Sequence, residues 1–150
     1  MKNTSASIFY NATRIVVKAG SGVLTGDNGL NLKAIKSISR DICALMDQST
    51  EVLLVSSGAM AAGEKKMAMT RPTELPQRQA VAAIGQAGLI MEYEKALARH
   101  GRNGAQILLT SNDLASRQRY LNARNTLNTL LSWNVLPIIN ENDTVAVEEI

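Results

Sequence analysis

The stretch EVLLVSSGAMAAG, residues 51–63, decides the fold. It begins with four consecutive apolar residues, and a short apolar run rich in β-branched residues predicts a strand buried on both faces of a parallel sheet. Ser57 and Gly58 come where this strand ends, and ligands of open α/β sheets bind beyond the carboxyl ends of strands. A hydroxyl group, a bare backbone and the start of a helix together suit an anion. The same pattern equally suits Ser57 as an ordinary helix N-cap.

Length and composition indicate one domain with an aliphatic core. The chain has 150 residues, of which 45% are hydrophobic and only 3% aromatic. The net charge of +3 is small and spread along the chain, so it argues weakly for an anionic ligand. No base-stacking aromatic residues accompany the basic ones, which disfavours a nucleic-acid partner. The single cysteine, Cys43, excludes an internal disulfide and a cysteine-based metal site, and no other metal site is predicted.

The ends of the chain and its hydropathy predict a protein of the cytoplasm. Residues 1–13 are polar and resemble a flexible leader. They lack the apolar segment of a signal peptide. No apolar run approaches the length needed to span a membrane, so no membrane partner is expected.

A first buried strand is predicted at residues 14–18, and it ends in Lys18. The following sequence, Ala19-Gly20-Ser21-Gly22, places two glycines around a serine. Such a loop lets backbone N–H groups approach a phosphate closely, and the lysine brings a positive charge to the same place. A tight turn is the alternative. The sequence is not a Walker A loop, because the lysine precedes the glycines.

The next elements predict a βαβ unit. Asn31 is a good N-cap, and apolar residues then recur every three or four positions as far as Gln48. Strand, helix and the strand at 52–55 follow one another within about forty residues, so the two strands should be parallel with a right-handed crossover.

The remaining chain repeats the alternation of helix and strand. Residues 64–77 break the periodicity, and they fit either a solvated loop or a lid over a substrate. Further elements are expected as a helix at 76–99, a buried strand at 105–109, a helix at 117–132 and a strand at 135–139. Pro137 lies within the last strand and favours an edge position or a bulge.

A polar cluster, Asn140-Glu141-Asn142-Asp143-Thr144, directly follows the last predicted strand. Carboxylates there can hold an ammonium group, and amides can hold a carboxylate. An Asx-type turn is the alternative interpretation.

Four parts of the chain, taken together, resemble the amino acid kinase family, and the likeness covers residues 14–150. They are VVKAGSGVL (16–24), VSSGAMAAG (55–63), AAIGQAGLI with AQILLT (82–90 and 105–110), and YLNARNTL with PIINENDTVA (120–127 and 137–146). The first part fits the whole family, and the others fit its glutamate-phosphorylating branch. The resemblance implies an α/β fold, a three-layer αβα sandwich with a mainly parallel sheet of the carbamate kinase-like type.

The resemblance also implies a reaction, transfer of phosphate from ATP with Mg²⁺ to the side-chain carboxylate of L-glutamate, the first step towards proline. Lys18 would be catalytic and would contact the transferring phosphoryl group. The phosphate-binding residues would be Lys18, Gly20, Ser21 and Gly22. The glutamate-binding residues would be Ser57, Gly58, Ala59, Asn140, Asn142 and Asp143. The alternative is a non-catalytic amino-acid sensor on the same scaffold.

Two departures from the family pattern affect these expectations. Gly22 stands where a second hydroxyl residue is usual. The chain also stops at Ile150, about a hundred residues short of the family pattern, so we expect residues 14–150 to be the N-terminal, substrate-binding part of the kinase domain, inactive alone without its ATP-binding half. A homo-oligomer is expected as well, with the helix carrying Gly85 and Gly88 as one candidate contact. Feedback by proline is a further family expectation.

Overall fold

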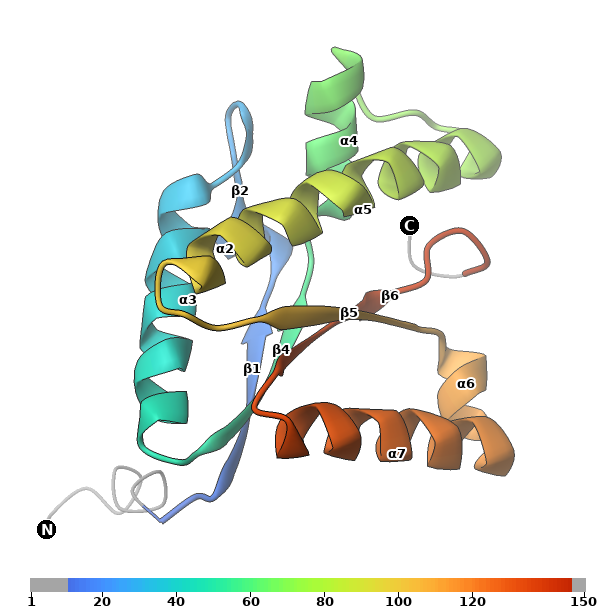
Figure 1. Cartoon of the computed structure of the whole chain (residues 1–150). Helices are drawn as coiled ribbons and strands as arrows, with labels where there is room; N and C mark the ends of the chain where they lie inside the picture. The colour runs from blue at the N-terminus through green and yellow to red at the C-terminus, as the bar shows by residue number, and fades with distance from the viewer. Residues whose placement is uncertain (1–10, 147–150) are drawn as a thin grey trace, which may run out of the picture.

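The structure is a computed structural model, and it describes residues 11–146. Four strands form one parallel sheet in the order β1-β4-β6-β5 (Figure 1). Their bounds are β1 Arg14–Ala19, β4 Glu51–Ser56, β5 Gly104–Leu109 and β6 Leu136–Glu141. Every paired neighbour in this sheet is parallel, which confirms the predicted α/β class with a mainly parallel sheet. Most of the predicted leader lies outside the described residues.

Helices lie on both sides of this sheet. They are α2 Ser21–Leu24, α3 Leu32–Asp47, α4 Ala59–Met67, α5 Leu75–Ala98, α6 Ser111–Ala115 and α7 Arg117–Ser132, and a small hairpin of β2 Thr25–Gly26 and β3 Gly29–Leu30 follows α2. Helices α3 and α5 pack together on one face, and β5 and β6 run between α5 and α7 in Figure 1. The arrangement is the expected αβα sandwich.

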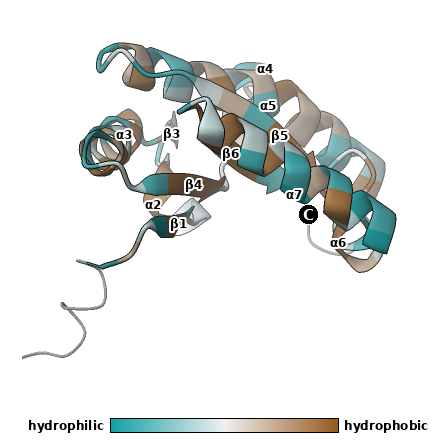
Figure 2. Ribbon diagram, turned by 60° about the horizontal axis from the view of Figure 1, so that its bottom comes forward, coloured by the Kyte–Doolittle hydropathy of each residue, from teal (hydrophilic) through white to brown (hydrophobic). Residues whose placement is uncertain are grey.

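The core lies between the sheet and the pair α3 and α5. Ile35 and Ile42 on α3, Leu54 on β4 and Leu97 on α5 are almost completely buried. Their spacing explains the elements, because residues three, four and seven apart share one face of a helix. Figure 2 shows β4 in the hydrophobic colour beneath α3. The free Cys43 is buried in the same core, and burial raises the pKa of its thiol.

The two outer strands are less buried than the sequence predicts. β1 alternates between exposed and partly buried residues, and Val16 on it is 62% exposed. β5 also alternates, with Leu108 exposed. The prediction of buried strands was wrong for these two, because each pairs on one side only within the described sheet and α7 covers the far face only near β6. It was right for β4, whose central residues 52–54 are all buried.

The predicted edge position of Pro137 was wrong. β6 lies between β4 and β5, and Pro137 pairs with Ala105. The N–H of Leu136 donates to the Asn103 carbonyl on the β5 side, so the alternation of the backbone turns the nitrogen of Pro137 towards β4. Pairing with β4 begins only at Ile138, so the missing N–H costs no ladder bond there.

Helices α4 and α5 approach each other closely because glycines lie at their contact. A Cβ atom on Gly85 would fall 1.8 Å from the Ala59 carbonyl oxygen, and one on Gly63 would fall 2.0 Å from the Val81 carbonyl oxygen. The predicted close packing at Gly85 is therefore a contact within the chain. Gly88 meets no atom within 4 Å. α4 extends to Met67, so only residues 68–74 of the predicted 64–77 excursion connect the two helices.

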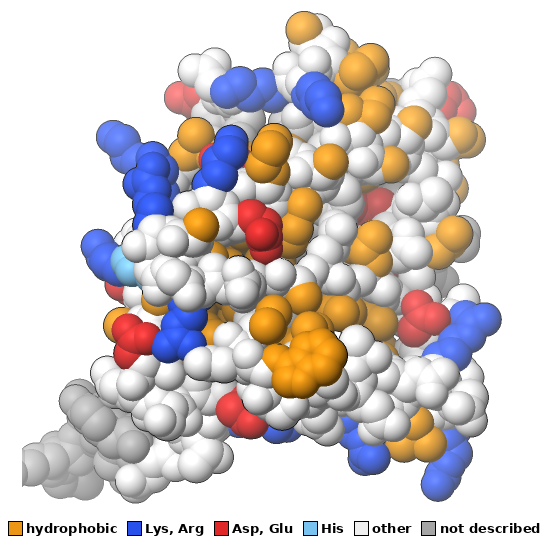
Figure 3. Space-filling model, viewed as in Figure 1, with side chains coloured by type: hydrophobic (Ala, Val, Ile, Leu, Met, Phe, Trp, Pro, Cys, Tyr) orange, Lys and Arg blue, Asp and Glu red, His pale blue; other side chains and the backbone are white. Residues whose placement is uncertain are grey.

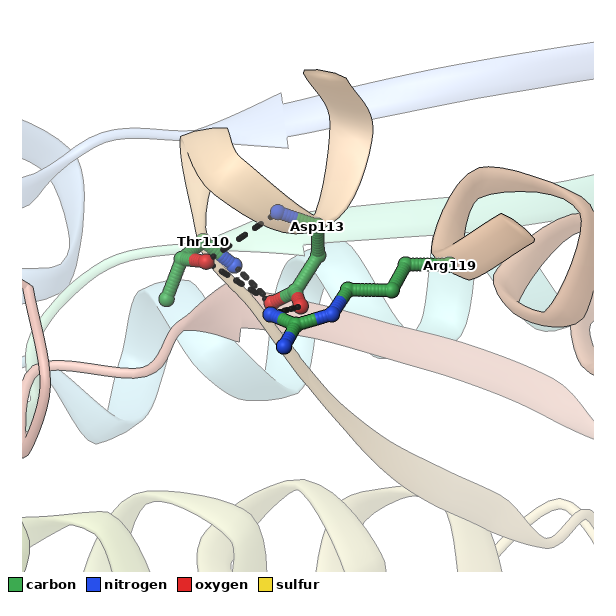
Figure 4. A network of polar contacts seen from close by, with 3 residues as sticks. All are labelled: Thr110, Asp113 and Arg119. Atoms are coloured by element: carbon green, nitrogen blue, oxygen red, sulfur yellow. Dashed lines mark hydrogen bonds and ion pairs between the residues drawn. The ribbon is translucent and has the colours of Figure 1, made fainter. Parts of the chain in front are cut away.

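A capping box begins α6 directly after β5 (Figure 4). The Asp113 N–H donates to the Thr110 hydroxyl oxygen at 3.3 Å, while the Thr110 hydroxyl and N–H both donate to the Asp113 carboxylate at 2.8 Å. Arg119 donates to the same carboxylate at 3.2 Å. These bonds, led by that of the Thr110 side chain, hold the pKa of Asp113 below its usual value.

Candidate functional site

Ser57 and Gly58 connect the end of β4 to the start of α4. Gly58 is the N-cap of α4 and adopts a left-handed conformation with φ of 111°, which explains a glycine at this position. Ser57 is therefore not the N-cap, and its hydroxyl group makes no hydrogen bond to any described residue. The N–H groups at the start of α4 have no partner within the helix. The turn thus carries a hydroxyl group and backbone donors close together in the chain.

The loop after β6 meets this turn across a cavity of about 260 Å³. The cavity is lined by Ser21, Ser57, Gly58, Ala59, Met60, Arg71, Asn140, Glu141 and Asp143. Six of the predicted site residues come together here from three carboxyl ends of strands, namely Ser21, Ser57, Gly58, Ala59, Asn140 and Asp143. Donors from α4 and carboxylates from the β6 loop therefore face one space.

The ionised form of Asp143 is disfavoured in this cavity. Burial raises the pKa of its carboxyl group above the usual value, and the nearby charge of Glu141 raises it further. Two carboxylates that share a partly buried space favour a cation between them. An ammonium group would relieve both causes, because it neutralises the repulsion and replaces lost water contacts.

Asn140 is held by two hydrogen bonds. Its Nδ2 donates to Oε1 of Gln86 on α5 at 3.3 Å, and its Oδ1 accepts from the Glu141 N–H at 2.8 Å. Gln86 belongs to the GQAGL stretch of the sequence. This stretch therefore has a local role, because it fixes the orientation of a side chain that lines the cavity.

The buried hydroxyl groups of Ser56 and Tyr93 form hydrogen bonds that hold the Ser57 peptide. The Ser56 hydroxyl donates to the Ser57 carbonyl at 3.1 Å and lies 2.9 Å from the Tyr93 hydroxyl. Because Ser56 has only one hydroxyl proton, Tyr93 is then the donor to Ser56. Tyr93 is completely buried, and this burial raises the pKa of its phenol. The peptide that begins the candidate site is thus fixed by the core.

Lys18 lies beside this turn without lining the cavity. It is the penultimate residue of β1, its side chain is exposed, and its Cα pairs with that of Val55. The Ser57 N–H donates to the carbonyl of Ala19, the next residue, at 3.0 Å. The side chain of Lys18 points to the face opposite Val17, because strand residues alternate and Val17 packs into the core.

The predicted glycine loop after β1 is a single helical turn. Gly20 is the N-cap of α2, and its carbonyl accepts from the N–H groups of Val23 and Leu24 at 3.1 Å. Gly20 and Gly22 do not line the cavity, whereas Ser21 does. A Cβ atom would meet nothing within 4 Å at either glycine, so both leave open space beside Ser21.

Asn142 does not line the cavity. Its N–H donates to the Leu109 carbonyl at 2.9 Å, and its own carbonyl accepts from Val145 and Ala146 at 3.1 Å. Its backbone therefore closes the turn that follows β6. The bonds to Val145 and Ala146 are made by the Asn142 carbonyl and not by its side chain, so they do not form the Asx-type turn that the sequence left open. Gln79 on α5 donates to the Ala146 carbonyl at 3.0 Å and secures the end of this turn.

Sequence reasoning missed Arg71, Met60, Glu141 and Gln86 as residues of the site. Glu141 was part of the polar cluster but received no role. Met60 and Gln86 lie next to predicted residues or behind them, so only the folded geometry identifies them. Arg71 lies in the 64–77 segment that the sequence left open between a loop and a lid, and no motif marked it.

We expect Asp143→Asn to stabilise the fold near neutral pH. A carboxyl group whose pKa is raised by folding binds its proton more tightly in the folded state, so its ionised form costs stability above that raised pKa. The gain should therefore be present at pH 7 and fade as the pH falls towards about 3.9, the unfolded value. Urea unfolding at several pH values measures it, with the exposed Asp27→Asn as a control that should show no such gain. Equal curves for the two variants would contradict the assigned burial cost.

The chain belongs to the amino acid kinase family, whose model matches residues 13–150. Several curated relatives are glutamate 5-kinases. The protein of Syntrophotalea carbinolica is 57% identical over 91% of this chain and 37% of its own length. The Thermus thermophilus protein is 52% identical over 93% of this chain and 38% of its own length, and the Syntrophus aciditrophicus protein 45% over 100% and 39%.

The chain thus spans between 37 and 39% of the length of these relatives. Among residues 11–146, no helix is both long and apolar enough to cross a membrane.

Proposed function

We propose that this chain supplies the glutamate-binding part of an enzyme that transfers phosphate from ATP to the side-chain carboxylate of L-glutamate, in the biosynthesis of proline. The observation that carries the proposal is the cavity between α4 and the β6 loop. One wall offers the Ser57 hydroxyl and the N–H groups that begin α4, which suit an anion. The opposite wall offers Glu141 and Asp143, which suit the substrate ammonium group. Membership of the amino acid kinase family, and similarity to glutamate 5-kinases, support the same proposed function.

The proposed reaction requires the protein to align the two substrates and to neutralise the charge on the phosphate oxygens. The acceptor carboxylate is already ionised near pH 7, so the reaction needs no general base. Phosphoryl transfer needs the two substrates in line and the oxygen charge neutralised. We assign the second task to Lys18, which stands beside Ser57 at the end of the neighbouring strand. The N–H groups around Ser21 would add backbone donors for phosphate.

ATP would bring Mg²⁺ on its phosphate oxygens, the usual arrangement when a protein supplies only one or two carboxylates. Within residues 11–146, no group of three or more His, Cys, Asp or Glu side chains lies together. When bound, the ion would neutralise charge on the transferring phosphate. The complete protein is further expected to be a cytoplasmic homo-oligomer that responds to proline.

A direct assay of the complete protein tests the proposal. With ATP, Mg²⁺ and L-glutamate, hydroxylamine should trap the acyl phosphate as a hydroxamate. L-aspartate, which is one methylene shorter, should react far less, because its carboxylate would not reach the phosphate when its ammonium group is held at Asp143. ATP hydrolysis without hydroxamate, or equal reaction with both amino acids, would contradict the proposed activity.

A non-catalytic amino-acid sensor is the second candidate. One observation favours it, since the cavity is lined without Lys18, and a sensor would need only the Ser57 and Asp143 walls. Lys18 separates the two candidates, because binding an amino acid requires no lysine at the phosphate end.

A further inference from the structure

The cavity carries more negative than positive charge, although the proposed substrate is itself an anion. Its lining has two carboxylates, Glu141 and Asp143, and a single cationic residue, Arg71. Glutamate presents two carboxylates and one ammonium group. If the ammonium lies between the two acids, its neighbouring α-carboxylate also comes close to them. A positive group is then required on the same side of the cavity to offset the repulsion.

Arg71 is held with its guanidinium group available to an anion. It lies in the short connection between α4 and α5, and its Nε donates to Oε1 of Glu64 on α4 at 2.9 Å. Its two terminal nitrogens donate to no described residue. A guanidinium group presents paired N–H donors that match the two oxygens of a carboxylate. The bond at Nε therefore orients the fork, and the remaining donors stay free for the substrate.

A separate positive cluster lies away from the cavity. A cluster of basic side chains lies between α3 and the end of α5, where Figure 3 shows Lys and Arg side chains gathered at the left edge. It is formed by Lys33, Lys36, Arg40, Arg99 and His100. None of these residues lines the candidate site, so this cluster cannot replace Arg71 there.

From these contacts we propose that Arg71 binds the α-carboxylate of the substrate and thereby selects an α-amino acid. The inference rests on the proposed function, because it assigns a residue to the same cavity. The ammonium group would lie at Asp143, the α-carboxylate at Arg71, and the side-chain carboxylate at Ser57 and the start of α4. Each charged group of the substrate then meets an opposite charge or a hydrogen-bond donor.

Arg71→Ala in the complete protein should raise KM for L-glutamate about tenfold and change kcat less than about twofold. Loss of a buried charge-assisted hydrogen bond would raise KM by more than about tenfold. The side chain of Arg71 is 61% exposed, however, and solvent weakens its interaction with the substrate. Arg40→Ala is the matched control, since Arg40 is 64% exposed and its Nε also donates to a carboxylate at 2.9 Å. The control should leave KM and kcat unchanged.

Two competitive inhibitors show which group of the substrate contacts Arg71. Glutarate keeps both carboxylates of glutamate and lacks the ammonium group, whereas 4-aminobutanoate keeps the ammonium group and lacks the α-carboxylate. Arg71→Ala should weaken inhibition by glutarate about tenfold and leave inhibition by 4-aminobutanoate unchanged. Asp143→Asn should weaken only 4-aminobutanoate. Arg71→Lys should recover part of the glutarate affinity, because it restores the charge without the paired donors.

The outcomes separate this inference from the proposed function. If the unaltered protein forms no hydroxamate from glutamate, the proposed function is wrong and the inference falls with it. If the protein is active but Arg71→Ala behaves like Arg40→Ala, only the inference is wrong. Equal losses for glutarate and 4-aminobutanoate, or a fall in kcat at unchanged KM, would also overturn it, because Arg71 would then act on the shared carboxylate or on the phosphate.

Discussion

Lys18→Ala in the complete protein should lower kcat about 100- to 1,000-fold while KM for L-glutamate changes less than about threefold. Removing one preorganised group that stabilises developing charge in a transition state costs about this much. The ammonium group of Lys18 would meet charge on the transferring phosphate, which is largest in the transition state. The proposal assigns glutamate binding to Ser57 and Asp143, so the affinity for glutamate should be largely retained.

The position of Lys18 makes this split between kcat and KM a sharp test. Lys18 does not line the cavity proposed for glutamate, yet the next residue accepts the hydrogen bond of the Ser57 N–H. Arg14→Ala is the matched control, because Arg14 lies on the same strand and face, is exposed, and makes only an exposed ion pair with Glu51. Steady-state kinetics with glutamate and ATP varied separately provide the measurement.

The result also decides between the two candidate functions. Equal losses of turnover and glutamate affinity, or no loss at all, would favour the amino-acid sensor and contradict the role of Lys18 in phosphate transfer. An effect of Arg14→Ala as large as that of Lys18→Ala would indicate a general influence of positive charge on this strand.

Gly85→Ala should strongly destabilise the fold. Its Cβ would fall 1.8 Å from the Ala59 carbonyl oxygen and 2.5 Å from the Gly63 nitrogen, both backbone atoms of α4. The two helices would have to separate, and such overpacking costs about 1–3 kcal/mol or more. Urea unfolding should show a lower midpoint with an unchanged slope.

Gly88→Ala is the control for this prediction. Gly88 lies three residues along the same helix and meets no atom within 4 Å. Alanine in a helix interior is about 0.5–1 kcal/mol more favourable than glycine, so this variant should be slightly more stable. Because Ala59 lines the cavity, Gly85→Ala should also raise KM for glutamate in the complete protein. Equal stability of the two variants would contradict the close approach of α4 and α5.

The ends of the strands were the part of the fold that the sequence predicted best. An apolar run followed by small or polar residues located β4 with Ser57 and β6 with Asn140, and both bring predicted residues to one cavity. This signal is local, because a buried strand and the change of residue type after it are adjacent in the chain. The parallel pairing of β1 with β4 likewise follows from one βαβ unit.

The order of the strands could not be predicted, because it depends on contacts between distant segments. Pro137 suggested an edge for a strand that lies inside the sheet, and its tolerance depends on where pairing with β4 begins. The sequence predicts that edge strands such as β1 are buried, because their residues are apolar. That pattern does not show whether a helix covers both faces of the strand. Arg71 could not be placed either, since a loop residue shows its neighbours only after folding.

A crystal structure of the complete protein with L-glutamate and a non-hydrolysable ATP analogue tests the central claim most directly. We predict the glutamate ammonium group about 3 Å from the Asp143 carboxylate, and the side-chain carboxylate at Ser57, facing the terminal phosphate beside Lys18. Glutamate bound outside this cavity, or bound within it with its ammonium group away from Asp143 and the phosphate remote from Lys18, would contradict the account.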